Sequence, residues 1–344
     1  MTQLGDNDYP IFEDEHTVYL LWQGEADTVA IIGDMSDWDE SVFMNRIEGT
    51  NLFYYHGQFE ANARLDYWLR ADTMPHPMVD LRNPFKDLSG YGESSELAMP
   101  EYIQHPLLSD FRSGRKGDFN DLGKQEIAAG ALPHPHEIFI YLPPNYQVDE
   151  RQYPAAYFQD AKDYIEFAMA PHILNQLIKA GKIAPLIGVF VNPPNLHQPK
   201  IPNRSTEYGM NEDYVHFFTQ ELVPFIDENF RTLRNSKSRL VIGDSYGGLI
   251  SLCIAFRHPD IFGNVYSQSG YLSFSNDSMI KEIEAAPVAP LDIYFDIGIY
   301  ERKVGAAFLP EEETDFLMAN RRFKQVLQHK GYDFIYFEYP EGHT

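Results

Sequence analysis

The stretch "VIGDSYGGLI", residues 241–250, decides the fold because it places one serine between two glycines at the end of an apolar run. The run "RLVIGD" (239–244) is strand-like, and the run that follows, "GGLISLCIAFRHP", has a helical pattern. A sharp strand-to-helix turn brings backbones into close contact, so it needs glycine beside the serine. The stretch therefore predicts a nucleophile elbow that exposes the hydroxyl of Ser245 in a strained backbone conformation.

Strand-like and helical segments alternate through the rest of this part of the chain. The other strand-like runs are "EIFIYLPP" (137–144), "PAAYFQD" (154–160), "PLIGVFV" (185–191), "NVYSQSG" (264–270), "LDIYFDIG" (291–298) and "DFIYFEYP" (333–340). Between them, residues 211–230 carry apolar side chains at helical spacing behind Asn211, a good N-cap. This alternation predicts an α/β fold over residues 116–344, a mostly parallel sheet with helices on both faces.

The first part of the chain has a different pattern of apolar and polar residues. Its runs alternate apolar and polar residues and are separated by Gly, Asn and Asp: "TVYLLWQ" (17–23), "TVAIIGD" (28–34), "LFYYHGQF" (52–59) and "LDYWLRAD" (65–72). This pattern predicts a small all-β, immunoglobulin-like sandwich. Residues 75–120 are rich in Pro, Gly and mixed charge and are predicted to be a linker. The predicted domains are therefore residues 1–115 and 116–344.

Composition narrows the choice of partners. The chain has 344 residues and a formal net charge of −24, which repels nucleic acid and anionic membrane surfaces. The single cysteine, Cys253, excludes an internal disulfide. The sequence shows no leader with a basic and then an apolar region, and no apolar run of about 18 residues. We therefore expect a soluble cytoplasmic protein, with no indication of its oligomeric state.

Neither a cofactor nor a metal is expected from the sequence. No glycine-rich dinucleotide loop opens the first strand–helix unit. The histidines of "HPHE" (134–137) stand at the start of a strand and have no matching ligand cluster.

A nucleophilic serine needs a base, which in this fold follows it in the chain after an acid. His258 and His329 lie in helical surroundings, whereas His343 in "YPEGHT" follows the last strand, where a loop can carry it to the elbow. His343 is therefore the predicted base.

Two carboxylates compete to orient that base. Glu301 stands in the loop "IYERK" after the strand 291–298, and Asp296 lies within the strand. The orienting acid acts from beyond the end of the strand, which favours Glu301 and leaves Asp296 in reserve. The amide of Tyr246, at the start of the helix, is expected to face the developing oxyanion.

These motifs resemble the α/β-hydrolase esterases that include enterochelin (siderophore) esterase, feruloyl and acetyl-xylan esterases and esterase D. The segments that carry the resemblance are "IFIYLPPNY", "YFQDAKDY", "RSTEYGM", "ELVPFIDENFRT", "VIGDSYGGL", "DIGIYER" and "YPEGHT". The resemblance implies a serine ester hydrolase that forms an acyl-enzyme on Ser245, with His343 as base and Glu301 as acid. Relatives continue past the Gly-His pair, whereas this sequence ends one residue later, so we expect either that the given sequence is incomplete or that His343 is unusually mobile.

The resemblance also implies that the backbone of "FQDAKDY" helps to form the oxyanion hole. Ala161 stands where relatives have glycine, and Lys162 follows it. Asp160 beside them and Arg204 of "RSTEYGM" are candidates for binding substrate. Arg204 is alternatively expected to pair with Glu207 and fix its loop.

The N-terminal segments "VAIIGDMSDWDESVFMNRI", "LFYYHGQF", "LDYWLRAD" and "DLRNPF" resemble the early-set sandwich of glycogen-binding and isoamylase-type modules. In sugar-binding members, aromatic rings stack on glucose, so Trp22, Trp38 and Trp68 are candidates for carbohydrate contact. The favoured interpretation is a core role for these rings and a lid or support role for the domain.

The substrate class stays open at this stage. A small-molecule ester of the enterochelin type, a siderophore trilactone, is strongly anionic when it is linked to iron and then needs a basic patch; the candidates are Arg204, Lys162, Lys200 and Arg302. Feruloyl or acetyl esters of plant polysaccharide are the alternative within the enzymes. An alternative of another class is a non-catalytic carbohydrate-binding protein on a hydrolase scaffold.

Overall fold

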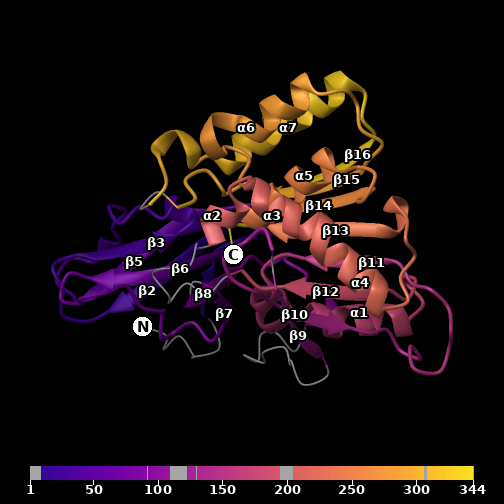
Figure 1. Cartoon of the computed structure of the whole chain (residues 1–344). Helices are drawn as coiled ribbons and strands as arrows, with labels where there is room; N and C mark the ends of the chain where they lie inside the picture. Colours follow the sequence, from indigo (N-terminus) through magenta and orange to yellow (C-terminus); the bar gives the residue numbers. More distant parts are fainter. Residues whose placement is uncertain are drawn as a thin grey trace. The chain divides into compact units, whose positions relative to one another are not determined.

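The structure is a computed structural model that describes residues 9–90, 92–108, 122–128, 130–193, 204–305 and 308–343. The chain forms two compact units (Figure 1). The first comprises Met1–Arg115, Gly298–Leu317 and Glu338–Thr344, and the second comprises Lys116–Ile297 and Met318–Phe337. Two loops from the end of the chain therefore belong to the same unit as the N-terminal strands.

Two four-stranded sheets, with the orders β1-β2-β5-β4 and β3-β6-β8-β7, build the first unit. Their strands are β1 (Ile11–Phe12), β2 (Thr17–Gln23), β3 (Val29–Gly33), β4 (Asn45–Arg46), β5 (Leu52–Gln58), β6 (Arg64–Ala71), β7 (Lys86–Ser89) and β8 (Gly92–Ala98). Alternate residues of both sheets, such as Leu20 and Leu65, share one buried core. The predicted all-β region is present.

Strands β7 and β8 lie in the segment predicted to be a linker, and that prediction is wrong for residues 86–89 and 92–98. The sequence "GESSELA" of β8 buries polar side chains in place of apolar ones. Glu96 pairs with Arg64 of β6 (Oε2–Nε 3.1 Å), and the hydroxyl of Ser95 accepts the amide of Asp80 at 2.7 Å. Buried polar groups that satisfy one another leave no hydrophobic pattern, so sequence periodicity does not find these strands.

An eight-stranded sheet forms the centre of the second unit, in the order β16-β15-β14-β13-β11-β12-β10-β9. The strands are β9 (Gly123–Ile127), β10 (His136–Tyr141), β11 (Ala155–Phe158), β12 (Ile187–Val191), β13 (Arg239–Asp244), β14 (Asn264–Gln268), β15 (Asp292–Gly298) and β16 (Phe334–Tyr339). Strands β12, β11, β13, β14 and β15 pair in parallel, and β10 and β9 continue one edge in antiparallel pairing. The predicted mostly parallel sheet is confirmed.

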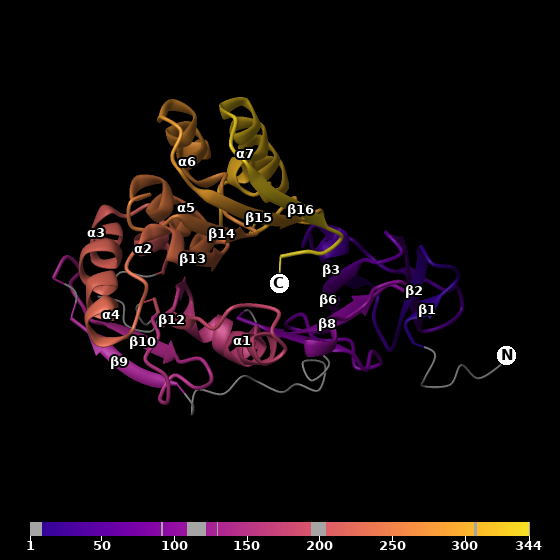
Figure 2. The ribbon, with the colours of Figure 1, turned by 90° about the vertical axis from the view of Figure 1, so that its right-hand side faces the viewer.

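Helices cover both faces of this sheet. They are α1 (Ala170–Lys179), α2 (Arg204–Tyr208), α3 (Glu212–His216), α4 (Val223–Asn229), α5 (Tyr246–Arg257), α6 (Phe274–Ala285) and α7 (Phe316–Lys330). Phe158 packs in a cluster with Leu174 of α1, whereas Val241 packs in another cluster with Val223 of α4 and Leu249 of α5. Figure 2 shows α1 and α4 on opposite sides of the strands.

The predicted helix over residues 211–230 is present. The Oδ1 atom of Asn211 accepts the amides of Asp213 (2.8 Å) and Tyr214 (3.2 Å), so the predicted N-cap is confirmed. A π-helical turn, Phe217–Leu222, joins α3 to α4. Within the described ranges, no helix is long and apolar enough to cross a membrane.

Candidate active site

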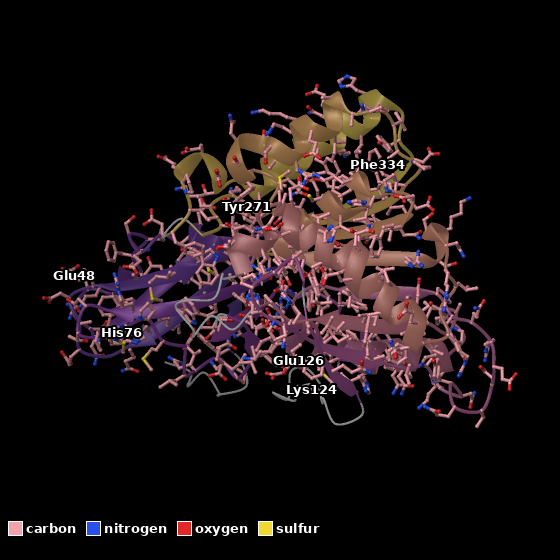
Figure 3. The ribbon with its side chains drawn as sticks, in the orientation of Figure 1. Glu48, His76, Lys124, Glu126, Tyr271 and Phe334 are labelled. Carbon is pink, nitrogen blue, oxygen red and sulfur yellow. The ribbon has the colours of Figure 1, made fainter. Side chains whose placement is uncertain are left out.

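Ser245 occupies the turn between β13 and α5. Its backbone has φ 58° and ψ −120°, a conformation that costs a non-glycine residue on the order of 1–3 kcal/mol. The amide of Ser245 donates to the carbonyl of Gln268, and the amide of Tyr271 donates to the carbonyl of Ser245, both at 3.0 Å. Tyr271, labelled in Figure 3, also packs its ring edge-on against Tyr246 at 4.7 Å. The elbow is therefore held from several sides, and Ser245, at 6 % exposure, is more enclosed than expected.

The glycines around Ser245 are required by close backbone approach. A Cβ atom on Gly243 would lie 2.3 Å from the carbonyl oxygen of Gly247. A Cβ atom on Gly248 would lie 2.6 Å from the hydroxyl oxygen of Ser267. Both distances are shorter than real carbon contacts, so only glycine fits at these two positions.

The backbone amides expected to bind an oxyanion lie at two helix starts. Tyr246 is the first residue of α5. Ala161 is buried and begins the helical turn that leads into the π-helix Asp163–Phe167, behind Asp160 at φ 51°. Amides in the first turn of a helix have no partner within the helix. The amide of Lys162, by contrast, donates to Oδ1 of Asn192 at 3.0 Å, a bond that it would have to give up to bind an oxyanion.

Asp160 and Arg204 bind each other. Nε and Nη2 of Arg204 donate to the two carboxylate oxygens of Asp160 at 2.7 Å, and Nη2 also reaches the carbonyl of Asp244 at 3.2 Å. The expected pair of Arg204 with Glu207 is therefore wrong, because Glu207 faces His134 and His136. The Arg204–Asp160 pair therefore links the loop before Ala161 to Asp244, the residue before Ser245.

Glu301 and His343 are brought together in the first unit. Nδ1 of His343 lies 2.6 Å from Oε2 of Glu301, and the amide of Gly298 donates to Oε1 at 2.7 Å. The Glu301 side chain is 0 % exposed and that of His343 is 7 % exposed. The ring of Phe316 packs edge-on against the imidazole at 5.3 Å. A buried carboxylate that makes two hydrogen bonds in this way fixes both the rotamer and the tautomer of a histidine.

The loop that carries His343 is anchored on strand β6, so the expectation of a mobile histidine is wrong. The amide of Arg64 donates to the carbonyl of Pro340 at 3.0 Å, and the amide of Tyr300 donates to that of Glu341 at 3.2 Å. Gly342 lies directly on Asp34: a Cβ atom added to it would be 1.9 Å from Cγ of that aspartate. Burial raises the pKa of Asp34 to about 6.

The reserve acid Asp296 has a different partner. Its Oδ2 accepts the hydroxyl of Tyr266 at 2.6 Å. Burial and the neighbouring Asp296 charge raise the pKa of Tyr266, which keeps this hydroxyl protonated as a donor. The geometry therefore favours Glu301 over Asp296 for the orienting role.

A cavity of about 280 Å³ in the first unit opens beside His343. Trp38 and Trp68 form part of its wall, with their rings edge-on at 5.2 Å, and Phe308 contributes a third ring. Nε1 of Trp38 donates to Asp34 at 3.0 Å, so one acid supports both the cavity wall and the loop of His343. Sequence patterns give no signal for Asp34 in this role. Trp22 packs elsewhere, edge-on against Phe53 at 5.6 Å.

Two of the four cations expected to form a basic patch are paired with carboxylates in the described part of the chain. Arg204 is paired with Asp160, and Nε of Arg302 is 3.1 Å from Asp37. Lys162 is exposed, and Lys200 lies outside the described residues.

A serine elbow after a central parallel strand, in a sheet covered on both faces, defines the α/β-hydrolase class of proteins. Comparison with known proteins agrees and is more specific: residues 129–344 match the model of the Esterase family, described as "Putative esterase". The chain therefore belongs to this family, and the protein is an esterase.

Several relatives are similar over much of the chain. Iron(III) enterobactin esterase of Escherichia coli (strain K12) is 24 % identical over 256 residues, which cover 66 % of this chain and 60 % of that protein. The enterobactin esterase FES from Shigella flexneri has a TM-score of 0.75 at 20 % identity, over 96 % of this chain and 90 % of that one. A ferulic acid esterase has a TM-score of 0.54 at 19 % identity, over 65 % and 91 %. At these identities, the two solved structures share the fold.

Proposed function

We propose that the protein hydrolyses carboxylic esters through an acyl-enzyme on Ser245, with His343 as general base and Glu301 as the acid that orients it. The backbone strain at Ser245 carries the proposal, because a non-glycine residue held at φ 58° between a strand and a helix presents its side chain as nucleophiles do. The buried Glu301–His343 contact supports it, since a carboxylate on Nδ1 leaves Nε2 as the proton acceptor.

The reaction then has two stages. Nε2 of His343 takes the hydroxyl proton as Oγ of Ser245 bonds to the acyl carbon, and the carbonyl oxygen becomes an oxyanion that the amides of Tyr246 and Ala161 stabilise. The ester C–O bond breaks, and the leaving alcohol receives the proton from His343. Water repeats the attack on the acyl-serine with the same proton acceptor, which releases the carboxylic acid and restores Ser245.

The cavity beside His343 favours an ester that carries an aromatic ring. Its wall of Trp38, Trp68 and Phe308 offers flat apolar faces and edges of the kind on which rings pack. The names of two relatives, for enterobactin and for ferulic acid, support an ester whose molecule carries a phenolic ring.

The charge of the cavity lining bears on the choice between an iron-bound enterobactin-like ester, which is anionic, and an uncharged feruloyl ester. The acids among its lining residues are Glu40 and Asp66, and no lysine or arginine belongs to the described lining. Burial raises the pKa of Asp66 well above its usual range, which favours its neutral form. A lining without positive charge favours an uncharged phenolic ester over an anionic iron complex of an enterobactin-like triester.

Two experiments test the proposal. A fluorophosphonate probe should label the protein once, on the peptide that contains Ser245, and Ser245→Ala should abolish both labelling and hydrolysis of p-nitrophenyl acetate. Equal, near-background rates for wild type and variant would leave the non-catalytic carbohydrate-binding alternative. A panel of methyl ferulate, an acetylated xylan oligosaccharide, and metal-free and iron-loaded enterobactin then ranks the substrates; we expect methyl ferulate to exceed the iron complex in kcat/KM.

A further inference from the structure

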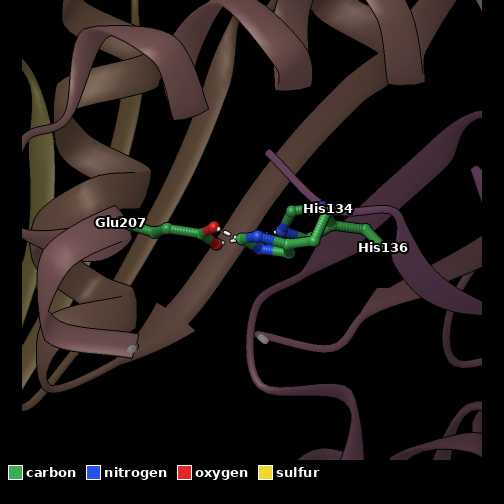
Figure 4. A group of neighbouring side chains, drawn as sticks. All are labelled: His134, His136 and Glu207. Carbon is green, nitrogen blue, oxygen red and sulfur yellow. Dashed lines mark hydrogen bonds and ion pairs between the residues drawn. The ribbon is translucent and has the colours of Figure 1, made fainter. Parts of the chain in front are cut away.

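A second cluster of titratable side chains, made of residues with no part in the proposed reaction, lies in the second unit. His134 and His136 of "HPHE" converge on Glu207 of α2, with their ligand atoms within 4.8 Å of one another (Figure 4). Nε2 of His136 lies 2.9 Å from Oε2 of Glu207, and Nε2 of His134 lies 2.8 Å from Oε1. The sequence showed no partner for the two histidines because Glu207 follows His136 by 71 residues.

This cluster is buried and incompletely hydrogen-bonded. The side chains of His134, His136 and Glu207 are 9 %, 0 % and 1 % exposed. Within the part of the chain that the structure describes, both ring nitrogens of His134, Nδ1 of His136 and Oε1 of Glu207 have no hydrogen-bond partner. The 2.8 Å approach of His134 to Glu207 is therefore a contact without hydrogen-bond alignment. Unpaired buried polar atoms are rare in native proteins, and a bound ion is one of the few arrangements that satisfies them.

We propose that His134, His136 and Glu207 bind a zinc ion. Two imidazole nitrogens and one carboxylate oxygen form a donor set that suits Zn²⁺. Bonds of about 2.0–2.2 Å at tetrahedral angles place neighbouring ligand atoms about 3.4 Å apart, so each N–O pair opens by about half an ångström. His136 is held by stacking on Phe217 at 4.5 Å, and the slightly exposed His134 supplies the movement.

The ion at this site has a structural role. None of the three ligands is among the residues that line the cavity beside His343, where we propose that the substrate binds. The ion joins the start of β10 and the residues before it to α2, which begins at Arg204. Arg204 forms an ion pair with Asp160, which precedes Ala161 of the proposed oxyanion hole. Zinc therefore stabilises the position of this ion pair without contacting substrate.

Zinc binding is measured on the full-length, tag-free protein after treatment with a chelator and removal of that chelator. Elemental analysis and titration calorimetry with ZnCl₂ should show one Zn²⁺ per chain. The midpoint of thermal unfolding, Tm, should rise by roughly 4 °C when free zinc exceeds Kd by about 100-fold. X-ray absorption at the zinc edge should show nitrogen and oxygen ligands and no sulfur.

Variants locate the site. His134→Gln replaces the most exposed ligand and is expected to keep the fold, so it should weaken binding at least about tenfold and reduce the zinc-dependent rise in Tm to about half or less. Glu207→Gln should lose binding altogether. His216→Gln, at an exposed position on the nearby helix α3, is the matched control and should bind zinc as the wild type does. The proposal is overturned if the wild type binds no stoichiometric zinc, which would leave a buried cluster that shares a proton. It is equally overturned if folded His134→Gln and Glu207→Gln bind zinc with unchanged affinity.

Discussion

Replacing Glu301 by glutamine isolates the orienting acid, because the side chain keeps its size and loses one hydrogen-bond acceptor. In the wild type, Oε1 accepts the amide of Gly298 at 2.7 Å, and Oε2 lies 2.6 Å from Nδ1 of His343. Both carboxylate oxygens can only accept, so Nδ1 carries the hydrogen, and in the proposed mechanism Nε2 is the atom that takes the proton of Ser245.

Glutamine offers one acceptor to these two donors. If its oxygen stays on Gly298, the NH₂ group faces Nδ1 of His343, and the ring hydrogen moves to Nε2, where it blocks the base. If the amide flips, its NH₂ group faces the Gly298 amide at 2.7 Å, and two buried donors in contact cost about 1–3 kcal/mol. The first arrangement is therefore favoured. We expect kcat/KM to fall by roughly 10³–10⁴, about 4–5 kcal/mol of transition-state stabilisation.

The assay is p-nitrophenyl acetate hydrolysis, with kcat and KM determined separately and thermal unfolding measured in parallel. Asp296→Asn is the matched control, because it removes one buried carboxylate charge in the partner of Tyr266 and leaves the Glu301–His343 contact in place. We expect it to cost less than about tenfold, since the hydroxyl of Tyr266 still has an acceptor. If Glu301→Gln keeps more than a tenth of the wild-type kcat/KM, or if Asp296→Asn is the more damaging change, the assignment of the acid fails.

Three further predictions concern groups around this site. Gly342→Ala puts a methyl group 1.9 Å from Cγ of Asp34, which must displace the loop of His343, so kcat/KM should fall at least about 100-fold; near-normal kinetics would contradict the contact. Burial raises the pKa of Asp34 from 3.8 to about 6. The protonated side chain therefore contributes to the free energy of unfolding below pH 4, and this contribution is lost as the pH rises through 6. Asp34→Asn should therefore gain up to about 3 kcal/mol of stability relative to wild type between pH 4 and 7 in urea unfolding, and a constant difference would oppose this. Burial raises the pKa of the Cys253 thiol to about 12, so a disulfide reagent at pH 8 should label it only after unfolding, and rapid labelling of the native protein would disprove its burial.

The elbow could be predicted from sequence because its determinants are local. Gly243, Ser245 and Gly248 are constrained by contacts with nearby turns and strands, and those constraints appear as a short pattern within one strand–helix unit. The parallel strands were recognisable for the same reason, since a strand covered on both faces is a continuous apolar run. The order of the acid and base along the chain followed from the resemblance and from strand positions.

Long-range polar contacts were not predictable from the same patterns. Strand β8 is polar because Glu96 and Ser95 are buried against Arg64 and Asp80, so it resembles a loop in sequence. The partner of His134 and His136 was missed because nothing in the sequence near them indicates Glu207. A buried polar residue is recognised only through its partner, and the partner is known only when the fold is known.

Local and long-range contacts also distinguish the two main groups of the proposed chemistry, Ser245 and His343. The conformation of Ser245 depends on residues within its own unit and mostly within one strand–helix turn, whereas the position of His343 depends on strands more than 200 residues earlier in the chain. Arg64 holds the backbone of Pro340, and Asp34 lies against Gly342 while it accepts the indole hydrogen of Trp38. Because Trp38 also lines the cavity beside His343, a change at this position should alter the proposed substrate cavity and the loop of the proposed base together. Under the proposed function, substitutions in the sandwich should therefore change substrate preference while the local structure of the elbow, which its own strand–helix unit holds, stays constant.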